Sequence, residues 1–297
     1  MNNKNLDALE NESISIIRDT YSSSENPVLL YSVGKDSSVL THLFKKAFYP
    51  LNVPVKLLHV DTTWKFKEMI KFRDDYASKN NLDLIVYKNQ EAIKNNITPF
   101  NNKNYTDIMK TETLKKALDE HGFDMIYGGA RRDEEASRSK ERVLSVRDKY
   151  HSWDPRNQRV EPWLIFNTEK ILDQTFRIFP ISNWTELNVW EYIKQESIDI
   201  VPLYFAKKRE VIIRDDEIYL YDDKRFEIKN TDIVKKLNVR FRTLGCYPLT
   251  AGIESDSDNL DKIIQELKDT SYSERSGRAI DKDRLGSMEI KKKEGYF

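Results

Sequence analysis

The sequence has one cysteine, Cys246, in 297 residues. A single thiol cannot form an internal disulfide framework or a C-x-x-C metal or redox pair, so dithiol chemistry is excluded. The chain also lacks an excess of charge of either sign, because 49 Lys and Arg residues balance 49 Asp and Glu residues. Without a global basic field there is little drive for non-specific nucleic-acid binding. We therefore expect no nucleic-acid partner and only local anion binding.

Long apolar runs are also missing. No segment has the uninterrupted apolar length of a membrane helix, and Met1 to Leu6 lack the apolar region of a secretory signal. These absences predict a cytoplasmic protein without a membrane partner. The four histidines form no H-x-x-H pair, so no protein-held metal site is predicted.

The most informative segment is a run of small polar residues, Ser32-Val33-Gly34-Lys35-Asp36-Ser37-Ser38. Apolar residues precede it at 28–31 and follow it at 39–44, which predicts a buried strand that turns into a helix. The first N–H groups of such a helix lack intrahelical acceptors, and with Lys35 they could bind a polyphosphate. The alternative is a turn that only caps the helix, since the same residue types favour caps.

The segment does not fit the common nucleotide-binding motifs. No glycine stands five positions before Gly34, and Asp36 rather than Ser or Thr follows the lysine, so it is not a Walker A loop. It is not G-x-G-x-x-G either. A different kind of phosphate loop is therefore predicted.

Strand and helix patterns alternate along the first two thirds of the chain, which predicts βαβ units. Strands are expected at 28–31, 55–60, 82–87 and 123–127, and helices at 6–17, 35–48, 64–78, 106–120 and 184–193, the last capped by Thr185. The fold class is α/β, with a doubly wound, mainly parallel sheet and flanking helices. From Lys207 the pattern changes to a β-hairpin at 211–221, so we expect two units, 1–206 and 207–297, the second ending in an extended tail.

Ligands of open parallel sheets bind outside the carboxyl ends of the strands, so the loops after the first, second and fourth strands should converge. Asp61 and Thr62 follow the second strand, where Asp61 could bind a ribose hydroxyl or hydrated Mg²⁺, or could only cap the next helix. After the fourth strand the candidates are Gly128, Gly129, Arg131, Arg132 and Arg138. The arginines could clamp an oxyanion, or they could form pairs with nearby glutamates on a solvated helix.

Some residue types are expected to be structural. Trp153, Trp163, Trp184 and Trp190 are predicted to lie in the core rather than to stack on a base, and Cys246 is predicted to be buried rather than nucleophilic. The tail from Ser271 to Phe297 is too polar to fold alone, so we expect it to be disordered or to gain order on a partner.

Taken together, the segments resemble the small-subunit family of bacterial heterodimeric sulfate adenylyltransferases. That family lies within the phosphoadenosine phosphosulfate reductase family and the adenine nucleotide α-hydrolase-like superfamily. The resemblance rests on residues 31–38, 59–66, 128–135, 179–187, 201–206 and 240–250, and on the tail segments 273–275, 286–289 and 294–297. Val33 stands where the superfamily usually has Gly, and the polar stretch 101–105 departs from the family's usual loop.

The resemblance implies that ATP and sulfate give adenosine 5′-phosphosulfate and pyrophosphate. It implies that Lys35 and the loop amides hold the pyrophosphate, that Mg²⁺ arrives with ATP without a tightly bound cofactor, and that Arg131 or Arg132 receives sulfate or the α-phosphate. The implied nucleotide-binding residues are Ser32 to Ser38, Asp61, Thr62, Gly128, Gly129 and Arg138.

The resemblance also implies a GTPase large subunit as partner. Forming the phosphate–sulfate anhydride is uphill, and this sequence has no G-x-x-x-x-G-K-[ST] motif of its own. One alternative is a phosphosulfate reductase, but the tail from Ser271 to Phe297 lacks the reactive cysteine that this activity needs. The other is a nucleotide-binding regulatory subunit without turnover.

Overall fold

The computed structural model describes residues 4–171 and 173–269. The strands are β1 (Pro27–Leu30), β2 (Lys56–Val60), β3 (Leu84–Tyr87), β4 (Met125–Tyr127), β5 (Leu144–Arg147), β6 (Thr175–Ile178), β7 (Lys207–Arg214), β8 (Glu217–Leu220), β9 (Ile233–Arg240) and β10 (Ile253–Glu254). The helices are α1 (Lys4–Tyr21), α2 (Lys35–Phe48), α3 (Lys67–Lys79), α4 (Gln90–Lys94), α5 (Thr113–His121), α6 (Ala136–Ser139), α7 (Glu186–Glu196) and α8 (Leu260–Asp269). A π-helical turn (Asp107–Glu112) precedes α5, and short 3₁₀ turns lie at Arg132–Glu134, Pro162–Leu164, Pro202–Tyr204 and Tyr247–Leu249. None of the described helices is long and apolar enough to cross a membrane.

A six-stranded sheet forms the centre of the molecule, in the order β3-β2-β1-β4-β6-β5. All neighbouring pairs in it are parallel except β5 with β6. The mainly parallel α/β fold expected from the sequence is therefore confirmed, with an antiparallel edge strand that the sequence pattern did not predict.

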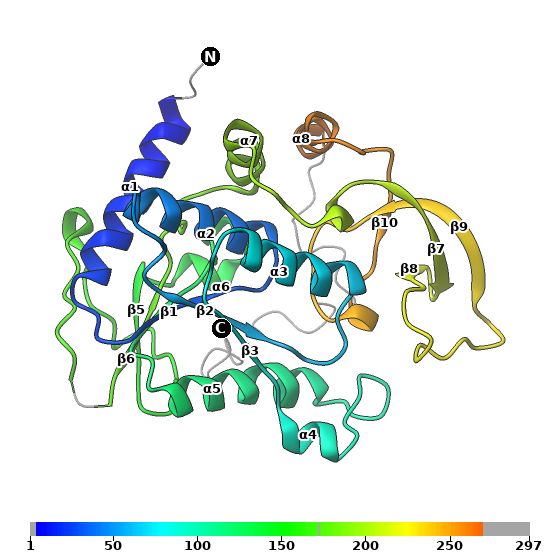
Figure 1. The fold of residues 1–297 in the computed structure, drawn as a ribbon, viewed down its shortest axis with the longest axis horizontal. Coiled ribbons are helices and arrows are strands. Elements are labelled where there is room, and N and C mark those ends of the chain that lie inside the picture. The colour runs from blue at the N-terminus through cyan, green and yellow to red at the C-terminus, as the bar shows by residue number, and fades with distance from the viewer. Residues whose placement is uncertain (1–3, 172, 270–297) are drawn as a thin grey trace.

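The two faces of this sheet are covered by different helices (Figure 1). Because side chains alternate along a strand, Val28, Leu58 and Ile126 lie on one face and pack with Leu114 and Leu118 of α5. The opposite face packs against α1, α2, α3 and α7 in a larger apolar cluster. This doubly covered arrangement explains why β1, β3 and β4 are almost wholly apolar.

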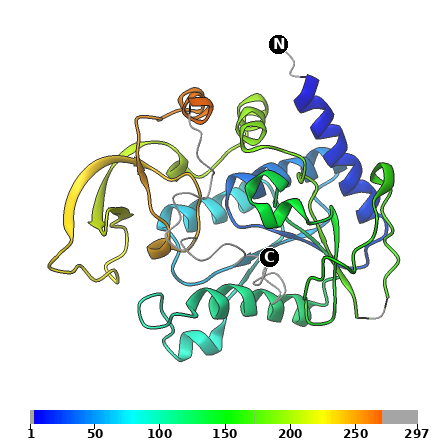
Figure 2. The same cartoon turned by 180° about the vertical axis from the view of Figure 1, so that it is seen from behind.

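A second, antiparallel sheet follows in the order β10-β9-β7-β8. Figures 1 and 2 show it at the end of the molecule away from α1. It begins at Lys207, where the sequence pattern changes. The larger apolar cluster includes Ile212 and Phe241 of this region, so the core continues across residue 206. The division into units 1–206 and 207–297 stays a prediction.

The outer edge of the central sheet at β5 is covered by side chains. The Glu161 carboxylate accepts the backbone N–H groups of Val143 and Leu144 at 3.2 and 2.7 Å. The Gln158 amide accepts the Val146 N–H at 2.9 Å and donates to the Val146 carbonyl at 3.2 Å. Side chains thus take hydrogen bonds that a further strand would otherwise make.

Several expectations are confirmed and others are wrong. The Thr185 cap is confirmed, because its Oγ1 accepts the Asn188 N–H at 3.1 Å. The helix expected from 64 begins only at Lys67, because the backbone is extended at Phe66, the N-cap, which has a ψ of 138°. Trp153, Trp184 and Trp190 are buried as expected, but Trp163 is 91% exposed, so its prediction was wrong. The expectation for the tail from Ser271 to Phe297 lies outside the described residues.

Candidate functional site

The carboxyl ends of β1, β2 and β4 open into one cleft with a volume of about 220 Å³. The loop after β1 contributes Ser32 and Gly34, and the first turn of α2 contributes Lys35, Asp36 and Ser37. β2 contributes its last residues, and the loop after β4 contributes Gly129 and Ala130. The predicted convergence of these three loops is confirmed.

The loop after β1 turns directly into α2. Gly34 is the N-cap and supplies no side-chain cap, whereas the Ser37 hydroxyl donates to the Gly34 carbonyl at 2.9 Å. Val33 has a φ of +65° and is 1% exposed, a conformation that strains a β-branched residue. Because Gly34 brings no capping side chain, this geometry favours a phosphate loop over a simple helix cap.

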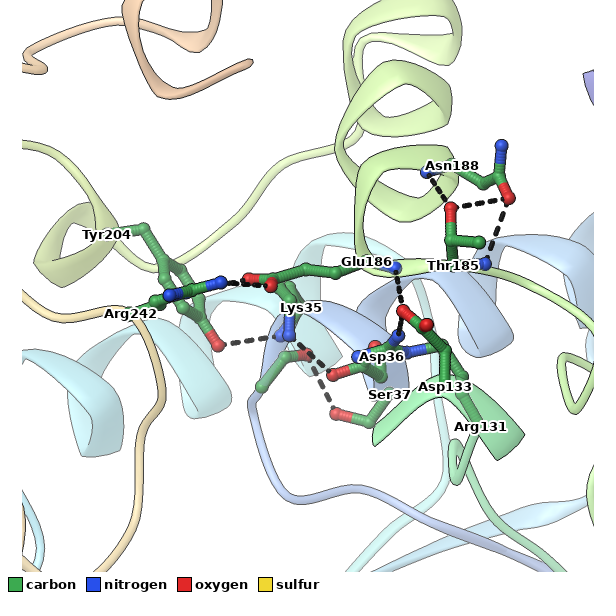
Figure 3. A network of polar contacts seen from close by, with 11 residues as sticks. Lys35, Asp36, Ser37, Arg131, Asp133, Thr185, Glu186, Asn188, Tyr204 and Arg242 are labelled. Carbon is green, nitrogen blue, oxygen red and sulfur yellow. Dashed lines mark hydrogen bonds and ion pairs between the residues drawn. The ribbon is translucent and has the colours of Figure 1, made fainter. Parts of the chain in front are cut away.

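Asp36 lies between two buried cations (Figure 3). Its carboxylate is 3.0 Å from Lys35 Nζ and 2.7 Å from Arg131 Nε, and both cationic side chains are 1% exposed. Burial alone would raise the pKa of Asp36, but the charges of Lys35 and Arg131 outweigh it and hold the pKa below its ordinary value. The carboxylate therefore joins the loop after β1 to the loop after β4.

The network continues from Arg131 toward the C-terminal region (Figure 3). Arg131 is 3.6 Å from the Asp133 carboxylate, which accepts the Glu186 N–H at 3.1 Å. Glu186 forms an ion pair of 2.8 Å with Arg242. Residues from four separate stretches of the chain are thus linked around the N-terminus of α7.

The predicted arginines do not come together in the cleft. Arg138 lines it and pairs with Glu141 at 3.1 Å, but Arg131 and Arg132 are not part of its wall. Arg131 is engaged by the two aspartates, and Arg132 donates to the Asn183 side chain. Their suggested contact with sulfate stays a prediction.

Asp61 and Thr62 also lie outside the cleft wall. The Asp61 carboxylate accepts the Thr63 N–H at 2.8 Å and is 3.2 Å from Lys88 Nζ. Burial would raise the pKa of Asp61, but these contacts lower it overall. Thr62 Oγ1 lies 3.4 Å from Cys246 Sγ, and Cys246 is buried as expected. A nucleotide-binding role for Asp61 and Thr62 stays a prediction.

The glycines after β4 bring two loops close together. Gly128 N–H donates to the Ile178 carbonyl at 2.9 Å and so continues the sheet ladder. A Cβ on Gly129 would lie 3.0 Å from Asp36 Cβ and 3.1 Å from the Asp36 backbone carbon. Only glycine permits this approach without a shift of the phosphate loop.

The cleft wall also includes residues that were not predicted as site residues. Among them are Lys65, Lys110, Tyr204, Thr243 and Leu244. Lys110 lies on the π-helical turn, and Tyr204 and Thr243 come from near the second sheet. Lysine and tyrosine are common on any surface, so their types carry no signal. For Lys65, Tyr204, Thr243 and Leu244 the signal was their position in segments that carry the family resemblance.

His59 of β2 also lines the cleft and is 2% exposed. Its Nδ1 lies 2.8 Å from the Tyr31 carbonyl, so Nδ1 carries a proton as the donor. Burial, followed by the charge of Lys65, lowers the pKa of His59 to about 3. The ring is therefore neutral at physiological pH.

No group of three or more His, Cys, Asp or Glu residues that could hold a metal ion occurs within residues 4–171 and 173–269. The charged residues of the cleft wall are four cations, Lys35, Lys65, Lys110 and Arg138, and two carboxylates, Asp36 and Glu134, so positive charge is in excess. Such a wall attracts an anion, or a metal ion that arrives already bound to phosphate oxygens.

Residues 26–252 match the model of the phosphoadenosine phosphosulfate reductase domain. The chain is 58% identical over 294 residues to sulfate adenylyltransferase subunit 2 of Psychromonas ingrahamii, covering 98% of this chain and 97% of that protein. It is 55% identical to the subunit 2 of Burkholderia lata, covering 98% and 99% of the two chains. Among solved structures, FMN adenylyltransferase of Candida glabrata has a TM-score of 0.51 at 17% identity, covering 93% of this chain and 88% of that chain, which indicates a shared fold.

We predict that Gly129→Ala destabilises the protein by about 1–3 kcal/mol, because the new methyl group would lie only 3.0 Å from Asp36 Cβ and 3.1 Å from its backbone carbon, so the start of α2 has to shift. Urea unfolding measures the effect. Gly252→Ala is the matched control, since its Cβ would meet nothing closer than the Arg240 carbonyl at 3.4 Å. Equal stability of the two variants would contradict the close approach of Gly129 to Asp36.

We also predict a pH effect of His59. Its pKa is about 3 in the folded protein against an ordinary 6.5, so between these values the unfolded chain binds a proton that the folded chain does not. The free energy of unfolding should therefore fall as the pH falls from 6.5 toward 3. In His59→Asn, which keeps a donor for the Tyr31 carbonyl, this dependence should be shallower. The exposed His121→Asn serves as control, and an unchanged slope in His59→Asn would refute the assignment.

Proposed function

This chain belongs to the phosphoadenosine phosphosulfate reductase domain family and, within it, to the sulfate adenylyltransferase subunit 2 proteins, and from this we propose that it transfers the adenylyl group of ATP to sulfate. The products are adenosine 5′-phosphosulfate and pyrophosphate. The observation that carries the proposal is the identity of 58% over 98% of the chain, which includes the phosphate loop that lines the cleft.

The cleft supports the roles that we assign. Lys35 and the first N–H groups of α2 hold the leaving pyrophosphate, because a helix N-terminus with an adjacent lysine favours a polyanion. Lys65, Lys110 and Arg138 add positive charge to the same cleft wall. Sulfate is a weak nucleophile, so the reaction depends on alignment of two anions and on neutralisation of their charge. No covalent intermediate on the protein is required.

We also propose the contacts expected of Arg131, Arg132 and Mg²⁺. Each arginine first has to give up the partner that it has in the structure. For Arg131 to receive sulfate or the α-phosphate, its ion pair with Asp36 has to be exchanged for the substrate anion. For Arg132, the hydrogen bond to Asn183 has to be exchanged in the same way. Mg²⁺ enters with ATP, because phosphate oxygens supply its preferred ligands.

We further propose that the chain acts with a partner subunit that hydrolyses GTP. The matched relatives are named as subunit 2, and adenylation of sulfate is energetically uphill. The sequence contains no Walker A motif that could bind GTP in this chain. Free energy from a partner would therefore drive the reaction forward.

The deciding experiment is sulfate-dependent exchange of labelled pyrophosphate into ATP. Exchange that requires sulfate supports the transferase. Binding of ATP without any exchange, with or without sulfate, would instead indicate a regulatory nucleotide-binding subunit. Release of sulfite from a phosphosulfate substrate with a thiol reductant would indicate a reductase.

We predict that Lys35→Ala lowers the exchange rate at least about tenfold, because it removes a charge-assisted contact of about 1.5–3 kcal/mol to the pyrophosphate. Lys71→Ala is the control, since that side chain is 78% exposed and pairs with Asp75 on the surface of α3. A folded Lys35→Ala protein with unchanged exchange would remove the loop from the mechanism.

A further inference from the structure

Tyr204 lies on the 3₁₀ turn that leads into β7, far along the chain from the phosphate loop. It is 2% exposed, and its ring packs edge-on against Trp190 with 5.3 Å between ring centroids. Its hydroxyl oxygen accepts the backbone N–H of Lys35 at 2.8 Å, as Figure 3 shows. Tyr204 also belongs to the wall of the cleft.

This hydrogen bond replaces a missing helix cap. In most helices the N-cap side chain accepts one of the first N–H groups, but the N-cap of α2 is Gly34 and makes no such bond. A hydroxyl from a residue 169 positions away does so instead. The bond also restrains a loop whose neighbouring residue, Val33, has a strained φ of +65°.

The bond determines which N–H groups remain for an anion. The helical ladder of α2 begins when Ser38 N–H donates to the Gly34 carbonyl at 3.0 Å. The N–H groups of Lys35, Asp36 and Ser37 precede this ladder and point toward the N-terminal end of the helix. Because Tyr204 takes the first of the three, a phosphate group is directed to the N–H groups of Asp36 and Ser37.

The same C-terminal part of the chain reaches the loop by a second route. Arg242 follows β9 and pairs with Glu186, whose backbone N–H donates to Asp133. Asp133 in turn faces Arg131, which holds the Asp36 carboxylate. The two routes end on adjacent residues. Tyr204 bonds the backbone of Lys35 directly, and the chain of contacts from Arg242 ends with Arg131 on the Asp36 side chain.

We propose that Tyr204 is a positioning residue of the phosphate loop, which sets the N-terminal N–H groups of α2 for the pyrophosphate half of the reaction. The proposal rests on the proposed function for the identity of the ligand. The contribution of Tyr204 lies on the phosphate side of the cleft, because its hydroxyl accepts the Lys35 N–H at the start of α2.

The test is Tyr204→Phe in the full-length protein, which removes only the hydroxyl group. Titration with inorganic pyrophosphate and Mg²⁺ should show binding weakened by roughly five- to tenfold, the expected result of losing one buried hydrogen bond. In the exchange assay the KM for pyrophosphate should rise by a similar factor, while the KM for sulfate stays within about twofold. Hydrogen exchange of the Lys35 amide should become faster, which tests the bond without any ligand.

Tyr192→Phe is the matched control. That tyrosine is also buried, and its hydroxyl donates to Glu10 at 2.6 Å on α1, away from the cleft. It should lose similar stability and keep wild-type binding of pyrophosphate. Equal weakening by both variants, or wild-type binding by Tyr204→Phe, would overturn the proposal. If the wild type binds pyrophosphate but shows no sulfate-dependent exchange, the proposed function fails while the comparison of the two variants still decides the role of Tyr204.

Discussion

The ion pairs of Asp36 are the interaction on which the rest of the site depends. One carboxylate is shared by Lys35 from the loop after β1 and by Arg131 from the loop after β4. Burial of two cations without this anion would cost free energy of folding. The two cations in turn lower the pKa of the Asp36 carboxyl group. The loop after β4 can approach Asp36 closely because Gly129 has no side chain. The contact therefore has both an electrostatic and a steric requirement. A polyphosphate that enters the cleft meets a lysine whose partner is already in place, and it has to compete with Asp36 for that charge.

The layered fold explains why this contact can form. Parallel strands β1 and β4 are direct neighbours, so the loops that follow them leave the sheet side by side. The helices packed on both faces fix these strands, whereas the loops lie at the edge where water and ligand have access. Tyr204, which precedes β7, and Arg242, which follows β9, reach the same edge of the central sheet. The region of the second sheet thus contributes to the site.

The sequence predicted the parts of this arrangement that depend on local pattern. Apolar strands, the glycine and serine residues of the phosphate loop and the Thr185 cap each follow from short-range rules, and the structure has them where they were expected. The edge strand β5 was missed, because its sequence, Leu-Ser-Val-Arg, is short and ends in Arg147, whose burial depends on an ion pair with Glu141 and a hydrogen bond to Ser145. Trp163 was misplaced because composition does not reveal which face of a loop meets solvent. Tyr204 and Lys110 reach the cleft by tertiary packing, for which one sequence gives no spacing rule.

The side chains that cover β5 have a consequence for how copies of this protein meet one another. A strand at the border of a sheet normally offers its outer N–H and carbonyl groups to any extended chain that comes near. Here the carboxylate of Glu161 and the amide of Gln158 already engage backbone groups of Val143, Leu144 and Val146. A neighbouring molecule would have to displace these groups before it could extend the ladder. The border of the central sheet at β5 is therefore closed to strand addition by two side chains, and the protein can be concentrated without this edge acting as a seed for association.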